Sequence, residues 1–379
     1  MNKKRIRDYG ITIGSLPTGK YNSIADISGV TVGHSTIDTE THKTGVTVIL
    51  PRPENIFKEK LIASSYVLNG YGKTTGLVQI NELGTLESPI ALTNTLNIGL
   101  VQNALVSYTI KRCEEDGTPL FSYNPVVGEC NDCHLNDIKD RAVKEEHVFA
   151  AFENASSDFE QGDVGAGKGT ICYGLKGGIG SSSRKIKLGN CEYHIGVLVQ
   201  SNFGKTEDLI INGMEVGKAI RDQITPSSTD KGSIISVIAT DLPLSSRQLH
   251  RILKRAAIGL GRTGSHVGHG SGDIMIGFST ANTIPVCEKS SDSKNGGSGN
   301  GNSENGGLEN VVSGSIVSEI KILNEDFMDL PFQAVIEAEE EAVLNSMIAA
   351  DTVIGYTGDV RYGLGELLEK YLKENLEEY

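Results

Sequence analysis

The sequence predicts an α/β sandwich in which strands are packed between layers of helices. Five short apolar runs, each bounded by Gly, Asp or Asn, have the length and composition of buried strands. Their low polarity on both faces indicates sheets that are covered on each side. Elsewhere, apolar residues recur at the spacing of amphipathic helices. A chain of 379 residues is long enough to bury a large core of this kind.

The expected strands are the apolar runs themselves, at residues 45–51, 147–152, 194–200, 233–240 and 273–280. The clearest helix is 245–259, where Leu249, Ile252, Leu253 and Ala256 repeat with helical spacing. Ser245 and Gln248 fit a capping box at its start, and Gly259 fits a stop signal. Further helices are expected at 101–108, 333–350 and 365–379.

Residues 289–310 have almost no apolar side chains and many Gly, Asn and Ser. Such a segment cannot offset its ordering entropy and is expected to be a flexible surface loop. Strand-like and helix-like segments lie on both sides of it. The loop is therefore interpreted as an insertion within a single catalytic domain that spans residues 1–379.

Composition excludes several classes of function. The net charge is −13, from 48 acidic and 35 basic residues, which argues against a nucleic-acid partner. No apolar run follows the basic first ten residues, and none approaches the length of a membrane helix. We therefore expect a cytoplasmic protein without a membrane partner, with its six cysteines reduced.

Residues 162–170, GDVGAGKGT, look like a phosphate-binding loop. Such a loop needs a buried strand before it and a helix after it, which aims backbone N–H groups at the phosphates. Here the upstream segment is polar, the downstream segment is rich in glycine, and Gly169 occupies a position that usually holds Ser or Thr. A glycine-rich turn between closely packed elements is the favoured interpretation, and a nucleotide-binding protein that uses Gly162–Thr170 stays open as an alternative.

Ser233 is the strongest candidate for chemistry. It begins an apolar strand and follows TPSSTDKG, a polar, turn-forming segment that ends at Gly232. If the Gly232–Ser233 bond is cut, the new α-amino group lies on the nucleophile itself and has an unperturbed pKa of about 7.7–8.0. An amine of that pKa is suited to act as the base for the weakly nucleophilic hydroxyl near neutral pH.

From Gly232 onward, GSIISVIATDLPLSSRQLHRILKRAAIGLGRTGS and SGDIMIGFSTAN resemble the self-processing region of the L-aminopeptidase/D-esterase family, which includes the β-peptidyl aminopeptidases. The similarity continues over most of the chain, through residues 6–37, 125–138, 162–184 and 197–204. It implies an αββα sandwich resembling the N-terminal-nucleophile hydrolases. It also implies a precursor cut into chains 1–232 and 233–379, which assemble as a homotetramer and need no cofactor.

The resemblance also implies roles for individual residues. Ser233 would be the nucleophile, Asn202 would donate to the oxyanion, Ser271 and Asp273 would orient the nucleophile and its amine, and Glu129 would hold the substrate's ammonium group. No metal is implied.

Other interpretations stay open for several of these residues. Asn131 stands where some relatives carry an aromatic side chain near the oxyanion, so its part in substrate binding and that of His134 are open. Asn202 and Asp273 also suit turns, and Glu129, if buried, has a lysine or arginine as an alternative partner. Cys130 and Cys133 form a CxxC pair, for which ordinary packing is favoured over a metal or redox site.

The expected activity is that of a self-processed serine hydrolase that releases N-terminal residues from small peptides, amides or esters. An acyltransferase of related architecture is the main alternative. Those relatives usually offer threonine as the nucleophile, so Ser233 counts against it.

Overall fold

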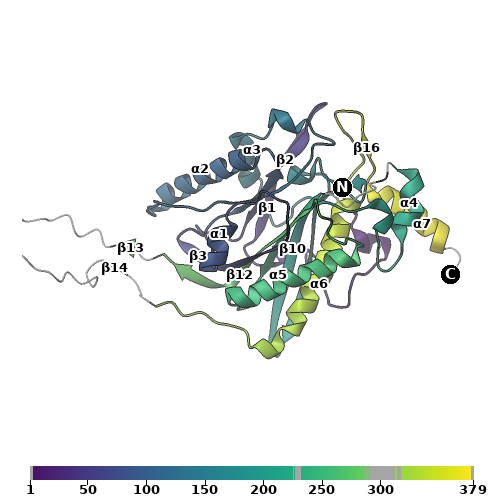
Figure 1. The fold of residues 1–379 in the computed structure, drawn as a ribbon. Helices are drawn as coiled ribbons and strands as arrows, with labels where there is room; N and C mark the ends of the chain where they lie inside the picture. The colour runs from purple at the N-terminus through teal and green to yellow at the C-terminus, as the bar shows by residue number, and fades with distance from the viewer. Residues whose placement is uncertain are drawn as a thin grey trace, which may run out of the picture.

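The computed structural model describes residues 3–224, 226, 232–286, 288–289, 312–313 and 317–376. Two β-sheets lie face to face, and helices cover the outer face of each sheet (Figure 1). The order of layers is helix, sheet, sheet, helix. This arrangement confirms the predicted αββα sandwich.

The larger sheet has six strands in the order β4-β3-β12-β11-β10-β9. Only the central pair β11 and β12 runs parallel, and every other neighbouring pair is antiparallel. The strands are β3 (Glu59–Gly70), β4 (Thr85–Leu86), β9 (Gly178–Leu188), β10 (Cys191–Asn202), β11 (Ser233–Thr240) and β12 (Gly272–Pro285). The strands predicted at 194–200, 233–240 and 273–280 are confirmed, and β11 has the predicted bounds.

The smaller sheet has four strands in the order β1-β2-β5-β6. Its strands are β1 (Thr31–Asp38), β2 (Lys43–Leu50), β5 (Ile90–Asn94) and β6 (Val126–Cys130). The strand predicted at 45–51 corresponds to β2. Strand β6 lies at the edge of this sheet and pairs in parallel with β5.

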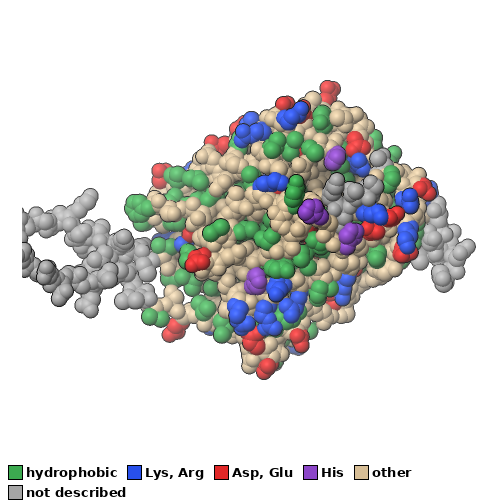
Figure 2. Space-filling model, in the orientation of Figure 1, with side chains coloured by type: hydrophobic (Ala, Val, Ile, Leu, Met, Phe, Trp, Pro, Cys, Tyr) green, Lys and Arg blue, Asp and Glu red, His purple; other side chains and the backbone are tan. Residues whose placement is uncertain are grey.

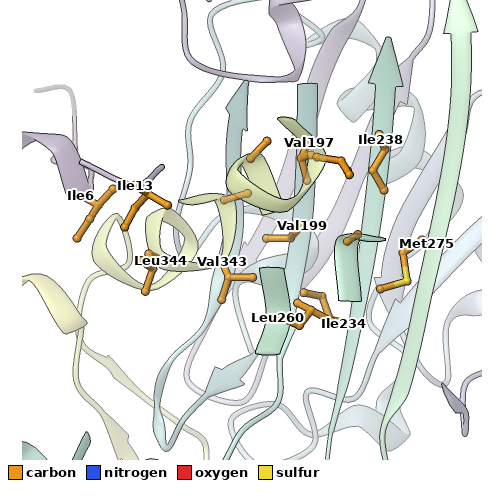
Figure 3. Packing of buried hydrophobic residues seen from close by; sticks show 14 of the residues in the cluster. Ile6, Ile13, Val197, Val199, Ile234, Ile238, Leu260, Met275, Val343 and Leu344 are labelled. Atoms are coloured by element: carbon orange, nitrogen blue, oxygen red, sulfur yellow. The ribbon is translucent and has the colours of Figure 1, made fainter. Parts of the chain in front are cut away.

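Apolar side chains fill the space between the sheets and the space under each helix layer. Leu92 of β5, Ile235 of β11 and Ile276 of β12 belong to the cluster between the two sheets. On the other face of the larger sheet, α5 (Ser246–Arg262) and α6 (Asp329–Ile348) close a second cluster. Figure 3 shows Val343 and Leu344 of this cluster packed among strand and N-terminal side chains. Every side chain of β11 is buried, because both faces of the strand are covered.

Helix α5 begins as the sequence predicts and ends later. The Ser245 hydroxyl accepts a hydrogen bond from the backbone N–H of Gln248, and the Gln248 side-chain oxygen accepts one from the backbone N–H of Ser245. Gly259, predicted as a stop, lies inside the helix instead. A Cβ at this position would come within 2.7 Å of the Cβ of Glu339, so Gly259 serves the close contact between α5 and α6.

The strand predicted at 147–152 is wrong, because these residues lie in helix α3 (Glu145–Glu153). Val148 and Ala151, three residues apart, are the buried side chains of this helix. A short apolar run does not by itself distinguish a helix from a strand. Here the flanking Glu145 and Glu153 belong to the helix, which packs on the outer face of the smaller sheet.

The remaining predicted helices are confirmed as α2 (Ile98–Asp116), α6 and α7 (Leu364–Leu376). Two short helices, α1 (Leu77–Leu83) and α4 (Val216–Ile220), complete the set in the described residues. Three two-stranded ribbons are formed by β7 (Ile171–Cys172) with β8 (Leu175–Lys176), β13 (Glu288–Lys289) with β14 (Val312–Ser313), and β15 (Val353–Ile354) with β16 (Val360–Arg361). Apart from Lys289, the predicted insertion 289–310 lies outside the described residues.

The surface combines basic and acidic groups. Figure 2 shows blue side chains gathered over α5, where Arg247 and Arg251 both pair with Glu325. Arg255 lies 3.4 Å from the ring centre of Phe332. None of the helices in the described residues is long and apolar enough to span a membrane.

Candidate active site

Three neighbouring strands of the larger sheet bring Asn202, Ser233 and Gly272 into one row. Ser233 at the start of β11 is the register partner of Asn202 at the end of β10. On its other side Ser233 is the partner of Gly272 at the start of β12. The residue predicted as nucleophile is thus flanked by the predicted oxyanion donor and by the segment that carries Ser271 and Asp273.

The bond between Gly232 and Ser233 has a distinctive geometry. The Ser233 hydroxyl donates to the carbonyl oxygen of Gly232 over 2.7 Å. The backbone N–H of Gly272 donates to the same oxygen over 3.0 Å. Gly232 has φ +154°, and a Cβ there would lie 1.8 Å from the carbonyl oxygen of Asn202. Only glycine fits at this position without moving the neighbouring strand.

The Asn202 side chain is buried and fixed in orientation. Its Oδ1 accepts a hydrogen bond of 2.9 Å from the backbone N–H of Ile171. An amide whose oxygen is used in this way presents its NH₂ group as a donor. Asn202 is therefore buried beside Ser233, and its NH₂ group is the part of the side chain that can donate a hydrogen bond.

Glu129 comes from the smaller sheet and is 2% exposed on β6. One carboxylate oxygen accepts from the backbone N–H of Lys73 over 3.1 Å. The other accepts a short hydrogen bond from the Thr95 hydroxyl. Neither bond comes from a charged side chain, so the lysine or arginine partner left open by the sequence is not what holds this carboxylate.

The side chains of Ser271 and Asp273, at the start of β12, are buried and hydrogen-bonded to each other. The Ser271 hydroxyl donates to Asp273 Oδ1 over 2.7 Å. Asn69 of β3 donates to the backbone carbonyls of Gly268, His269 and Ser271, which holds the preceding turn in place.

A cavity of about 460 Å³ opens at this end of the sandwich. Of the residues predicted for the site, Ser233, Asn202, Glu129, Asn131 and Gly232 line it, and His134 lines it as well. Ser271 and Asp273 are not among its lining residues, although Asp273 lies on β12 next to Ser233 and Ser271 directly precedes that strand. The cavity is thus lined by Ser233 and Asn202 from the larger sheet and by Glu129 from the smaller sheet.

Comparison with known proteins identifies the family. The family model described as peptidase family S58 matches residues 22–361, most of the chain. The chain belongs to peptidase family S58. A β-peptidyl aminopeptidase (BapA) of Sphingosinicella xenopeptidilytica is 36% identical to this S58 chain, and the match covers 95% of the chain and 88% of the relative.

Solved structures of S58-like chains agree with the fold. The PH0078 protein of Pyrococcus horikoshii OT3 is 43% identical with a TM-score of 0.85, over 97% of this chain and 98% of that one. The L-aminopeptidase D-Ala-esterase/amidase of Ochrobactrum anthropi, described as a serine aminopeptidase with a variant of the Ntn hydrolase fold, is 34% identical with a TM-score of 0.84, over 98% and 99%. The chain is an aminopeptidase with the fold of the N-terminal-nucleophile hydrolases.

The cavity of the S58 peptidase is also lined by residues that the sequence did not single out. Tyr71, Lys73, Thr95 and Arg361 line the cavity from three separate parts of the chain. Thr95 follows β5, next to β6, and is therefore close to Glu129. The sequence shows no pattern that links these positions, because they meet only through the packing of the two sheets and the β15–β16 ribbon.

The glycine-rich segment 162–170 of the S58 peptidase is a tight turn with one short 3₁₀ helix at Gly165–Gly167, as the favoured interpretation held. A Cβ at Gly167 would lie 2.5 Å from the backbone nitrogen of Ile179, so the turn passes very close to β9. Lys168 pairs with Asp38 and Asp163 instead of pointing to an open cradle. The turn has no strand before it and no helix after it within the described residues, so its geometry does not support nucleotide binding.

Lys176 lies fully buried beside this turn and supports it. Its ammonium group donates to the carbonyls of Gly167, Thr170 and Gly177 over 2.8–2.9 Å. Burial lowers the pKa of Lys176 to about 7. The three bonds tie the turn to the backbone that precedes β9.

Cys130, the first cysteine of the CxxC pair, has a packing role. Cys130 is fully buried between the sheets, and its thiol contacts the carbonyl oxygens of Gln200 and Ser233. Burial raises the pKa of this thiol well above its usual value. Cys133 is half-buried at the cavity wall. Cys130 therefore behaves as a small apolar residue packed against β11.

Proposed function

We propose that this S58 aminopeptidase cuts its own chain between Gly232 and Ser233, and that the freed Ser233 then removes N-terminal residues from short peptides, amides or esters. The observation that carries the proposal is the pair of hydrogen bonds on the Gly232 carbonyl. The attacking hydroxyl is already at 2.7 Å from its oxygen, and the Gly272 N–H polarises that oxygen from 3.0 Å.

In self-cleavage, the Ser233 oxygen attacks the carbonyl carbon of Gly232. Negative charge develops on the Gly232 oxygen, where the Gly272 N–H stabilises it. The hydroxyl proton passes to the Ser233 nitrogen as the C–N bond breaks, which leaves an ester between Gly232 and the serine oxygen. Water then hydrolyses the ester to a Gly232 carboxylate, and Ser233 has a free α-amine.

In peptide hydrolysis, the new α-amine takes the proton from its own hydroxyl while the oxygen attacks the substrate carbonyl. The Asn202 NH₂ group donates to the oxyanion, a role supported by its fixed orientation beside Ser233. The protonated amine returns the proton to the leaving nitrogen. Water, activated by the same amine, releases the acyl group from the serine oxygen.

Glu129 is proposed to bind the ammonium group of the substrate. Its carboxylate is buried at the cavity wall and accepts two neutral hydrogen bonds, so its negative charge has no cationic partner among the described residues. A buried carboxylate without a cation favours a ligand that brings one. This arrangement explains why a free N-terminus would be required.

Ser271 and Asp273 are proposed to position the nucleophile and not to touch the substrate. They lie on the strand beside Ser233 and outside the cavity lining, which supports an indirect role. Asn131 is proposed to contact the substrate, because it is exposed at the wall and its Oδ1 is held by the Cys133 N–H over 3.0 Å.

The test is the intact mass of the purified protein under denaturing conditions. Two chains, 1–232 and 233–379, are expected in place of one chain of 40.5 kDa. Ser233→Ala should give only the full-length chain and no hydrolysis, because one oxygen serves both reactions. A wild-type chain that stays whole after prolonged incubation but still hydrolyses peptides would overturn the proposed mechanism.

A homotetramer of cleaved protomers is proposed as the working assembly. Large apolar side chains are exposed outside the cavity, among them Val78 and Leu83 on α1 at 86% and 61%. Exposed apolar groups of this kind favour association with another surface. Light scattering of the cleaved protein should give four times the protomer mass, and a monomer would contradict the assembly without affecting the proposed chemistry.

A further inference from the structure

A lysine with no acidic partner stands at the wall of the active-site cavity. Lys73 lines this cavity and is exposed. Its ammonium group is 3.4 Å from the carbonyl oxygen of Tyr71 and 5.1 Å from the centre of the Tyr71 ring. Within the described part of the chain, no carboxylate lies within 4 Å of it. Its positive charge is therefore available to a ligand.

Arg361, the other lysine or arginine among the lining residues, is already neutralised. Arg361 donates twice to the Asp359 carboxylate, over 3.0 and 2.8 Å, and once to the carbonyl of Gly174. Glu129 supplies a negative charge on the same wall. The cavity thus offers one negative site and one positive site that lack a charged partner among the described residues.

These two sites are joined by a short, fixed piece of backbone. The N–H of Lys73 donates to Glu129, so the residue that carries the cation also holds the carboxylate in place. Just before it, Gly72 packs against Gly272, where a Cβ would come within 2.9 Å of the backbone. The segment 71–73 therefore runs from the end of β3, past Gly272 beside Ser233, to the proposed ammonium site.

We propose that Lys73 binds the free carboxylate of a short peptide substrate and makes the enzyme prefer zwitterionic dipeptides. The inference rests on the proposed function, because it assumes that Glu129 holds the ammonium group. An extended residue spans about 3.3–3.6 Å, so a dipeptide separates its two charges by roughly 7 Å. Each further residue places the substrate carboxylate farther from Lys73, whose backbone N–H is hydrogen-bonded to Glu129.

The experiment compares two substrates that differ only in charge, alanyl-alanine and alanyl-alanine amide. The cleaved wild type should prefer the free acid by about 5-fold in kcat/KM, as for a partly exposed ion pair. Lys73→Met should lower kcat/KM for the free acid more than for the amide, and so bring the ratio of acid to amide close to one. Lys73→Arg should retain the preference, and Lys73→Glu should reverse it. Lys111→Met, at an exposed position on α2, is the matched control and should behave as the wild type.

A length series sharpens the test. The preference for acid over amide should shrink from the dipeptide to the tetrapeptide. If the wild type treats the acid and the amide dipeptides alike, or if Lys73→Met lowers both equally, Lys73 does not bind the carboxylate, while the proposed function stands. If the wild type hydrolyses neither substrate, the proposed function fails and this inference fails with it.

Discussion

The two sheets meet at the cavity and contribute different kinds of groups to it. The six-stranded sheet supplies Ser233, Asn202 and the Gly272 backbone, all of which lie in one row beside the proposed scissile bond. The four-stranded sheet supplies Glu129, with Thr95 beside it. Glu129 is the group proposed to hold the charged amino end of the substrate, and its two hydrogen bonds come from Lys73 and Thr95, away from the proposed scissile bond.

The difference follows from where each strand lies in its sheet. Strand β11 has hydrogen-bonded neighbours on both sides and apolar clusters on both faces, so its first residue is held firmly. Covalent chemistry needs a firmly held nucleophile, since displacing the reacting group by about 1 Å can cost roughly 10²-fold in rate. Strand β6 is an edge strand. Long-range attraction between charges tolerates more variation in distance, so recognition can reside at an edge.

The largest effect is expected at Gly232, where the sheet is tightest. In Gly232→Ala the added Cβ would lie 1.8 Å from the Asn202 carbonyl, so the scissile carbonyl must move. Maturation should slow by about 10²-fold or more, measured as the fraction cleaved over time by mass spectrometry. Gly261→Ala on α5 is the matched control, because its Cβ would meet nothing within 4 Å. Normal maturation of Gly232→Ala would show that the strand ends at Asn202, Ser233 and Gly272 are less rigid than their packing indicates.

Asn202→Asp tests the oxyanion donor with little change in shape. The aspartate keeps an acceptor for the Ile171 N–H and removes the NH₂ donor. The value of kcat on peptides should fall by roughly 10²–10³-fold, the usual effect of losing one oxyanion donor. Self-cleavage should suffer less, since the Gly232 oxygen has the Gly272 N–H. An unchanged kcat in the cleaved variant would assign the oxyanion to other donors.

Glu129→Gln separates recognition from chemistry. It removes a charge-assisted hydrogen bond worth about 1.5–3 kcal/mol, or roughly 10- to 150-fold in kcat/KM on free-amine substrates. Self-cleavage should be spared, because the precursor has no free amine at the bond to be cut. The glutamine can still accept from the Lys73 N–H, so the wall should keep its shape.

The control for this variant is a substrate acetylated on its amine. It should be nearly inert with the wild type and lose little more with Glu129→Gln. If self-cleavage fails together with turnover, Glu129 supports the nucleophile sheet and the division between the two sheets is wrong. If neither changes, the ammonium group is held elsewhere.

The smallest effect is expected for changes in the predicted insertion 289–310. Replacing it by a brief Gly-Ser connection should leave kcat/KM within about 2-fold, because loop-closure entropy changes by only about 0.6 kcal/mol per doubling of length. Steady-state kinetics and a melting curve of the shortened chain check this. A large fall in turnover with an unchanged melting curve would give the segment a part in catalysis.

Local signals in the sequence predicted much of the fold. The apolar run 233–240 has the same bounds as β11, and the capping box at Ser245 forms as expected. Both signals act over a few neighbouring residues, through burial and through hydrogen bonds to the next turn. The resemblance to a known family then pointed to Asn202, Ser233 and Glu129, which the structure places around one cavity.

Other features were decided by contacts between distant segments. Residues 147–152 form a helix because they cover a sheet, and Gly259 is a packing position because α6 crosses there. No functional pattern in the sequence singled out Thr95 or Lys73, although Lys73 lies in a segment that contains Gly70, Gly72 and Gly76.

The sequence by itself determined that strands pack between helices, where β11 begins, and that Gly232 precedes it, because apolar periodicity and turn chemistry are local properties of the chain. Tertiary structure alone decided which groups surround Ser233. Asn202 and Gly272 become its neighbours through strand register, over separations of 31 and 39 residues in the chain. Glu129 joins them only because the two sheets stack on a shared apolar core, a contact between residues far apart in sequence.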